Sequence, residues 1–230
     1  MRFWVDPLPR PGAYREVAIV VDVIRATTTA GVYLEAGAEA LVLAPSLEAA
    51  RALRRPGEVL AGEVGGLRPE GFDLGNSPKE AEGVRGRTVV MATTNGTRAA
   101  HAAKGARAIL LGSLQNASSV AQKASELGEE VALVAAGKEG RMALDDLYAV
   151  GVIGARLLAL GFRPEGEMAH LALFLAQSPP LEVLWVSEAA QALERVGLGA
   201  DVALCAQVDR HGVVPVFQGF RDGGMVFGRG

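Results

Sequence analysis

The sequence predicts an α/β fold of three layers, in which helices cover both faces of a largely parallel or mixed sheet and the C-terminal third is rich in helix. Short β-branched apolar runs alternate with helical patterns over the first two thirds of the chain, which is typical of strands joined by helices. The runs show no clean polar alternation, as expected for strands buried on both faces. With 230 residues, half of them hydrophobic, and no repeat or low-complexity linker, we expect a single domain over residues 1–230.

Six apolar runs are predicted to be strands: Val17–Asp22, Ala40–Ala44, Val59–Ala61, Thr88–Ala92, Ala108–Leu111 and Val131–Ala135. The clearest helical patterns between and after them are Thr28–Ala36, Leu47–Arg54, Thr97–Ala103, Ala117–Leu127 and Leu144–Leu160. A further helix is expected from Ser187 to Val196, where Ser187 can cap the first turn. Two late strands, Val202–Ala206 and Val213–Phe217, are expected to flank a turn at Asp209–Gly212.

The composition argues against several classes of partner. With 23 basic and 26 acidic residues, the chain has no charge excess that would attract nucleic acid or an anionic membrane. Cys205 lies in an apolar run and is expected to be buried. Residues 1–12 lack the apolar stretch of a signal peptide, and Leu144–Leu160 carries three charges, which argues against a membrane span. We expect a cytoplasmic protein, and a homo-oligomer remains open.

Uncharged polar residues are concentrated in loops. Six of the seven threonines fall within residues 27–29 and 93–97, and the three asparagines are Asn76, Asn95 and Asn116. Most of these residues follow a predicted strand. Because open α/β sheets bind ligands at the carboxyl ends of their strands, we expect a binding site there.

The first such loop contains Asp22, Arg25 and a threonine run. Arg25 suits bidentate binding of a phosphate or sulfonate, and Thr27 and Thr28 start a helix whose first amides can hold an anion. The alternative is that the threonines merely cap that helix. A surface ion pair is the alternative for Arg25.

A second anion cradle is expected at residues 94–97, because a helical pattern follows Asn95-Gly96 and makes a hairpin turn the weaker alternative. The anion-binding candidates beyond the first loop are Asn76, Ser77, Thr94, Asn95, Gly96, Thr97, Asn116 and Gly137. Asp73 and Asn76 could instead be Asx-turn residues. Asp145 and Asp146 could complement a helix dipole, and only one of them is expected to face the site, since adjacent helical residues point about 100° apart.

Five segments occur in an order that resembles the 2-phosphosulfolactate phosphatase family, which is associated with coenzyme M synthesis. The segments are DVIRATTT, GEVGGLRPEGFDLGNSP, TTNGT, LGSLQNAS and AAGKEGRMALDD. The resemblance covers Val17–Gly154, and the tail Asp201–Pro215 is similar too. The chain departs from the family pattern at Ala135, where Cys is expected, and at Asp145, where Glu is usual. Neither departure removes a carboxylate.

The resemblance implies Mg²⁺-dependent hydrolysis of a small anionic phosphorylated substrate, 2-phosphosulfolactate, to sulfolactate and phosphate. Mg²⁺ prefers oxygen ligands, and the expected ligands are Asp22, Glu63, Asp73 and Asp145. The expected catalytic residues are Asp22, Glu63, Asp73 and Asp146. Water could attack phosphorus directly, or Asp22 could attack first and form an aspartyl-phosphate. The alternatives are a phosphatase for another phospho-hydroxyacid and a non-catalytic anion or nucleotide sensor.

Overall fold

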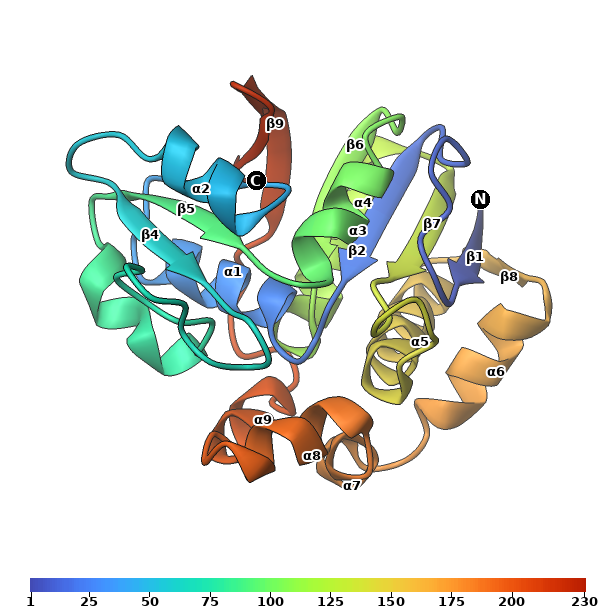
Figure 1. Cartoon of the computed structure of the whole chain (residues 1–230). Coiled ribbons are helices and arrows are strands. Elements are labelled where there is room, and N and C mark those ends of the chain that lie inside the picture. Colours follow the sequence, from blue (N-terminus) through green and yellow to red (C-terminus); the bar gives the residue numbers. More distant parts are fainter.

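A computed structural model describes all 230 residues and contains one ten-stranded sheet (Figure 1). The strands are β1 (Arg2–Asp6), β2 (Val17–Val21), β3 (Ala40–Leu43), β4 (Val59–Gly62), β5 (Thr88–Ala92), β6 (Ala108–Gly112), β7 (Glu130–Ala135), β8 (Arg163–Glu165), β9 (Pro215–Arg221) and β10 (Gly224–Arg229). The helices are α1 (Ala26–Glu35), α2 (Leu47–Leu53), α3 (Gly96–Ala102), α4 (Ala117–Leu127), α5 (Leu144–Ala159), α6 (Glu167–Leu175), α7 (Pro180–Trp185), α8 (Glu188–Arg195) and α9 (Ala200–Cys205). The predicted α/β class and all six early strands are confirmed.

The sheet has the strand order β4-β5-β3-β10-β9-β6-β2-β7-β1-β8. It consists of two parallel blocks, β4-β5-β3 and β6-β2-β7-β1-β8, joined by the antiparallel hairpin β9–β10. Because β10 is antiparallel to β3 and β9 is antiparallel to β6, the two blocks run in opposite senses along the sheet. In Figure 1, β4 and β5 approach the centre of the molecule from one side and β2 from the other.

The two faces of β2 show how the layers are filled. Ile19 and Val21 belong to a core that includes apolar residues of α4 and α5. Ala18 and Val20 belong to a separate core with α1 and α3. Successive side chains of β2 therefore point into two different apolar cores, and every residue of the strand is buried.

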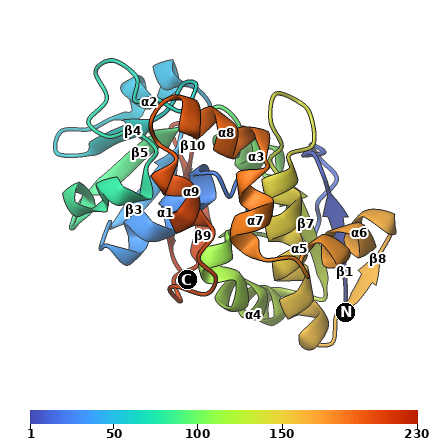
Figure 2. The same cartoon turned by 90° about the horizontal axis from the view of Figure 1, so that it is seen from below.

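The helices α7, α8 and α9 lie together at the lower end of the molecule in Figure 1 and across its middle in Figure 2, which is seen from below. They belong to the helix-rich C-terminal third that the sequence predicts. No helix is both long and apolar enough to cross a membrane. Helix α9 anchors this end through Val202 and Cys205, which are fully buried in the core shared with α4 and α5.

Two expectations about the C-terminal region are wrong. Residues Val202–Ala206 belong mainly to α9 and are not a strand, because Val202 and Cys205 are buried at helical spacing. The hairpin lies later than expected, with its turn at Asp222-Gly223. The late strand expected at Val213–Phe217 overlaps only the start of β9.

Candidate active site

A cavity of about 310 Å³ opens where the loops after β2, β4, β5 and β7 meet, and α8 closes one side of it. Nine of the residues singled out from the sequence line this cavity: Asp22, Arg25, Glu63, Asn76, Thr94, Asn95, Gly137, Asp145 and Asp146. Residues from four strand ends of the two oppositely directed blocks therefore share one space. The strand-end location of the site agrees with the sequence-based expectation.

Asp22 is held at the amino ends of two helices. Its Oδ1 accepts a hydrogen bond from the amide of Ala26, 3.2 Å away, at the start of α1. Gly96, the first residue of α3, lies so close that an added Cβ would stand 2.8 Å from Asp22 Oδ2, and its amide also favours the charged carboxylate. The helix ends that we expected to cradle a substrate anion thus hold a carboxylate of the chain itself.

Burial raises the pKa of Asp22 to about 7 against the effect of the Ala26 amide, and the charges of Asp145 and Glu63 raise it further. Burial likewise raises the pKa of Asp145 to about 6, although its own amide and the charge of Lys138 act in the opposite direction. The cavity therefore brings carboxylates together without an equal number of cations beside them. Such an arrangement favours either a proton or a metal cation.

The neighbouring acids Asp145 and Asp146 differ in what their oxygens contact. Asp146 accepts hydrogen bonds from the amides of Val23, at 2.8 Å, and Gly137, at 3.0 Å, and so ties the loop after β2 to the loop after β7. Asp145 Oδ1 is buried and has no hydrogen-bond partner. Both residues line the cavity, but Asp145 is the one with an oxygen free for a ligand.

Glu63 connects two loops of the cavity wall. Its Oε2 accepts the amide of Gly66 at 2.8 Å, and its Oε1 accepts the amide of Thr94 at 2.8 Å. The side chain is only partly buried, and each oxygen keeps a lone pair. Glu63 therefore shapes the loops after β4 and β5 in addition to contributing negative charge.

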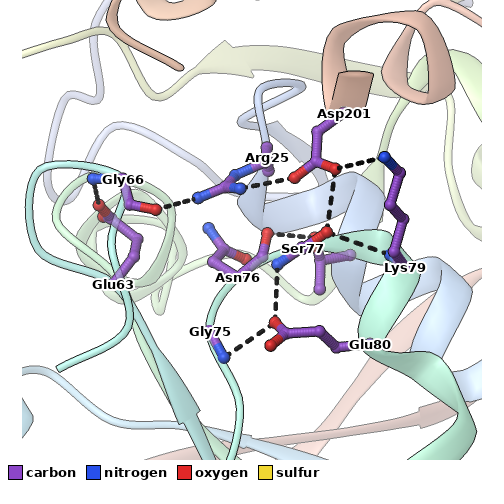
Figure 3. Close-up of polar contacts among 10 residues, drawn as sticks. Arg25, Glu63, Gly66, Gly75, Asn76, Ser77, Lys79, Glu80 and Asp201 are labelled. Atoms are coloured by element: carbon purple, nitrogen blue, oxygen red, sulfur yellow. Dashed lines mark hydrogen bonds and ion pairs between the residues drawn. The ribbon is translucent and has the colours of Figure 1, made fainter. Parts of the chain in front are cut away.

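Arg25 is fixed from two sides (Figure 3). Its Nη1 lies 2.6 Å from Oδ2 of Asp201 in α9, and its Nη2 donates to the carbonyl of Gly66 at 2.6 Å. The side chains of Arg25 and Asp201 are 2% and 1% exposed. A buried guanidinium paired in this way has one preferred orientation, and its remaining N–H groups are available to a ligand.

The same network reaches the loop after β4. Ser77 Oγ donates to Asp201 Oδ1 at 3.0 Å, and the Lys79 ammonium lies 3.9 Å from the same oxygen (Figure 3). Next to Ser77, the side-chain oxygen of Asn76 is buried without a partner. Asn76 lines the cavity, so this amide is a further group that can contact a ligand.

Asp73, expected as a metal ligand and catalytic residue, lies outside the cavity. Its Oδ2 accepts the amide of Leu60 at 2.8 Å and pairs with Arg54 Nη2 at 2.8 Å. Leu60 belongs to β4 and lies two residues before its carboxyl end, so the loop folds back along the strand. The structure does not bring Asp73 to the other carboxylates.

Six of the expected anion-binding residues do not line the cavity: Thr27, Thr28, Ser77, Gly96, Thr97 and Asn116. The threonine hydroxyls bond to backbone groups within their own strand-to-helix turns, at Asp22, Val23 and Thr93 respectively. The structure therefore supports a local role for the threonines, as residues that close the turns before α1 and α3, although no side chain caps either helix.

Asn116 is fully buried and acts as a connector. Its Oδ1 accepts the amide of Ser113 at 2.8 Å, and its Nδ2 donates to the carbonyls of Leu111 and Val213 at 3.2 and 3.0 Å. All of its contacts are internal. It therefore joins the end of β6 to the segment before β9.

Sequence reasoning missed four charged groups at the site: Lys138, Glu139, Arg195 and Asp201. The first three line the cavity, and Asp201 lies behind Arg25. Arg195 belongs to α8, which follows no strand, so the rule that directs attention to strand ends cannot find it. For Asp201, the family-like tail that starts at this residue is the only signal in the sequence.

Comparison with known proteins gives a consistent result. A model of the 2-phosphosulpholactate phosphatase family matches residues 5–219. The chain belongs to this family. A relative from Thermus thermophilus named "Probable 2-phosphosulfolactate phosphatase" is 55% identical, and the match covers all of both chains. Relatives with the same printed name in Deinococcus radiodurans and Carboxydothermus hydrogenoformans are 49% and 37% identical and cover 94% and 87% of this chain, and 92% and 85% of their own.

The resemblance to 2-phosphosulfolactate phosphatases implies a bound divalent cation, which needs oxygen ligands from the cavity side chains. No group of three or more His, Cys, Asp or Glu side chains is placed to hold a metal ion by itself. Mg²⁺, however, is usually bound by one or two carboxylates, with water and substrate phosphate completing the shell. Asp145, with its unpartnered buried oxygen, and Asp22 fit this donor set.

Proposed function

We propose that this chain hydrolyses the phosphate ester of 2-phosphosulfolactate to sulfolactate and inorganic phosphate. The observation that carries the proposal is a single cavity lined by the buried carboxylates of Asp22 and Asp145 and by the fixed guanidinium of Arg25. Membership of the family supports the choice of substrate. A pure anion sensor gains nothing from carboxylates beside its ligand, because they repel it.

We propose further that the reaction depends on Mg²⁺, held by Asp22 and Asp145. When bound, the cation would neutralise phosphoryl oxygens and so favour attack at phosphorus. Asp146, next to Asp145 in α5, accepts the amides of Val23 and Gly137 and so fixes α5 against the loop that carries Asp22. Glu63 likewise fixes the loop of Thr94.

The remaining N–H groups of Arg25 would bind the phosphate, because Asp201 and Gly66 hold the guanidinium in place before substrate arrives. The Nδ2 group of Asn76, which lines the cavity, would donate a second hydrogen bond to the phosphate. In the reaction, a water oxygen bonds to phosphorus and the bond from phosphorus to the C2 oxygen breaks. One proton of the water ends on the C2 oxygen of sulfolactate, and the other stays on the released phosphate. We favour direct attack by water, since the Asp22 carboxylate, oriented by amides of α1 and α3, is itself proposed to hold Mg²⁺.

Phosphate release by the purified chain tests the activity. We expect release from 2-phosphosulfolactate that stops in EDTA, returns with Mg²⁺, and falls roughly 100-fold or more in Asp145→Asn. Phosphate release that persists in EDTA would contradict the proposed dependence on Mg²⁺ but would still support the phosphatase activity. Release from phospholactate but not from 2-phosphosulfolactate would point to another phospho-hydroxyacid, and no release from any ester would favour the sensor.

The route of attack has a separate measurement. Direct attack by water leaves the chain unmodified, so mass spectrometry of acid-quenched turnover mixtures should show no added phosphoryl group. A phosphorylated peptide containing Asp22 would instead establish the aspartyl-phosphate route. We also propose coenzyme M synthesis as the pathway served, and loss of coenzyme M on deletion of the gene in its host would be the supporting result.

A further inference from the structure

Two cations of the cavity have no carboxylate partner. Lys138 forms no ion pair, and the only hydrogen bond of its side chain is from Nζ to the carbonyl of Glu188, at 3.2 Å. Arg195 forms neither an ion pair nor a side-chain hydrogen bond. Arg25 differs, because Asp201 balances its charge at 2.6 Å. The positive charge that is free to attract a ligand therefore comes from Lys138 and Arg195.

These two cations lie at different depths. Lys138 directly follows Gly137 in the loop after β7, is half-buried, and lies close enough to Asp145 for its charge to stabilise that carboxylate. Arg195 is exposed and belongs to the last turn of α8. One cation thus lies near the proposed reaction centre, and the other lies at the mouth of the cavity.

Helix α8 is held in place at its first turn. Ser187 Oγ accepts the amide of Ala190 at 3.1 Å and caps the helix. The backbone carbonyl of Glu188 accepts a hydrogen bond from Lys138 Nζ, and the Glu188 carboxylate forms an ion pair with Arg141 at 3.2 Å. The loop after β7 and α8 are therefore connected, and the small side chains Ala189 and Ala192 on the cavity side leave room for a ligand.

The proposed substrate carries three anionic groups, a phosphate, a carboxylate and a sulfonate, at fixed positions along its carbon chain. Its phosphate oxygen and its carboxylate are both attached to C2, whereas the sulfonate sulfur is attached to C3 and lies one bond further out. We propose that Lys138 binds the carboxylate and that Arg195 binds the sulfonate, so that these two residues determine which phosphate esters the site selects. This inference rests on the proposed function, because it places the phosphate at Arg25 and the acidic residues.

Arginine suits the outer position. A guanidinium presents two parallel N–H donors to two oxygens of a sulfonate, and its charge does not depend on pH in the working range. A lysine at the inner position presents a compact charge beside Asp145, where a wider guanidinium would need more space. The chemistry of each cation thus matches the group assigned to it.

Three esters separate the two roles: 2-phosphosulfolactate, 2-phospholactate, which lacks the sulfonate, and 1-sulfopropan-2-yl phosphate, in which a methyl group replaces the carboxylate. We expect Arg195→Ala to lower kcat/KM for the two sulfonates about 10- to 100-fold more than for 2-phospholactate. Lys138→Ala should lower kcat/KM for the two carboxylates by a similar excess over the third ester. Arg195→Lys should recover part of the selectivity.

The control is Arg85→Ala, which removes an exposed arginine outside the cavity and should leave the ratios of kcat/KM unchanged. Thermal melting of each variant separates misfolding from loss of recognition. Equal losses on all three esters in Arg195→Ala would overturn the inference and leave the phosphatase activity standing. A wild-type chain that hydrolyses none of the three would instead overturn the proposed function.

Discussion

A buried carboxylate without a neutralising partner destabilises the folded chain at neutral pH, and Asp145 is such a group. Burial raises its pKa from 3.8 to about 6, so over that range the folded chain binds the proton more tightly than the unfolded chain. The free energy of unfolding contributed by Asp145 therefore falls as pH rises through this window and stays low above it. A site of this kind trades stability for function.

The Asp145→Asn variant should consequently be more stable than the wild type at pH 8 in EDTA. The expected gain is about 1–3 kcal/mol, and it should largely disappear by pH 3, where the aspartate is mostly protonated in both states. Urea unfolding at the two pH values measures it. A gain of equal size at both pH values would show that packing, and not charge, is responsible.

Asp201 is a second residue whose replacement has a defined consequence. Asp201→Ala leaves the guanidinium of Arg25 buried without its anion, which should cost about 3–5 kcal/mol in urea unfolding. The double variant Arg25→Met/Asp201→Leu should cost less, because no charge remains buried. Asp222→Asn breaks the exposed pair with Arg55, keeps a residue that accepts the positive φ of 49°, and is the control, with an expected cost of about 0–1 kcal/mol. A small effect of Asp201→Ala would contradict the role of Asp201 in fixing Arg25.

The location of a single residue in the fold can be predicted from the sequence when the residue directly follows a strand, but not when it lies far from one along the chain. Asp22 directly follows β2, so its place at the carboxyl edge follows from the strand alone. Asp73 lies eleven residues after β4 within a long loop, and no local pattern indicates that the loop folds back to Leu60. Asp201 is separated from Arg25 by 176 residues and comes close only through the packing of α9.

Among the elements, α4 shows how a distant residue completes a helix. Asp209 accepts the amide of Ser118 at 2.7 Å and its hydroxyl at 2.8 Å, and pairs with Arg156 of α5 at 3.2 Å. Burial acts to raise the pKa of Asp209, but these contacts outweigh it and lower the pKa. The charged form of Asp209 therefore stabilises the folded chain at pH values above the ordinary pKa of an aspartate, and this contribution is lost as the pH falls through the lowered pKa.

Asp209→Asn should cost about 1 kcal/mol at pH 7 and much less at pH 3, measured by thermal or urea unfolding. Asparagine accepts the positive φ of 51° at this position, so backbone strain does not confuse the result. Asp222→Asn, at φ 49° in an exposed turn, is the matched control and should show little change. A cost that does not depend on pH would exclude the charge as its cause.

Element prediction succeeds where periodicity and length agree. Helix α4 has the bounds expected from its pattern, Ala117–Leu127, and Thr88–Ala92 has those expected for β5. The short run after Asp201 is ambiguous, because five apolar residues fit a strand or a buried helical turn equally well. The edge strand β8 is missed because Arg163, Pro164 and Glu165 are not typical strand residues. Strand β1 is missed because its apolar run is only three residues long, between Arg2 and Asp6.

The whole sheet depends on its C-terminal hairpin. Strand β10 pairs with β3 through Met225, Val226 and Phe227, whereas β9 and β6 share a single registered pair, Leu110 and Val216. Strand order is a property of long-range pairing, so the reversal between the two parallel blocks could not be predicted from any local pattern. The loops of the site nevertheless meet because the blocks converge.

Phe227→Ala should therefore destabilise the whole molecule. Phe227 is fully buried within the core of α1 and α3, and its truncation should cost about 3–5 kcal/mol. Phe220→Ala on the same hairpin removes a side chain that is 55% exposed and is the matched control. Urea unfolding followed by far-UV circular dichroism and by tryptophan fluorescence should give one coincident transition for Phe227→Ala. Separate transitions would show that the two blocks unfold independently.

The position of the hairpin in the chain also affects how the protein is made. A ribosome delivers β9 and β10 after the other eight strands, so β3 and β6 emerge with free edges and must wait for their common neighbour. Exposed edges of this kind invite pairing between nascent chains. The loops after β4 and β5 belong to one block and those after β2 and β7 to the other, so they can meet only once the hairpin joins the blocks. A chain stalled before Pro215 would hold every proposed ligand residue and still lack a complete site.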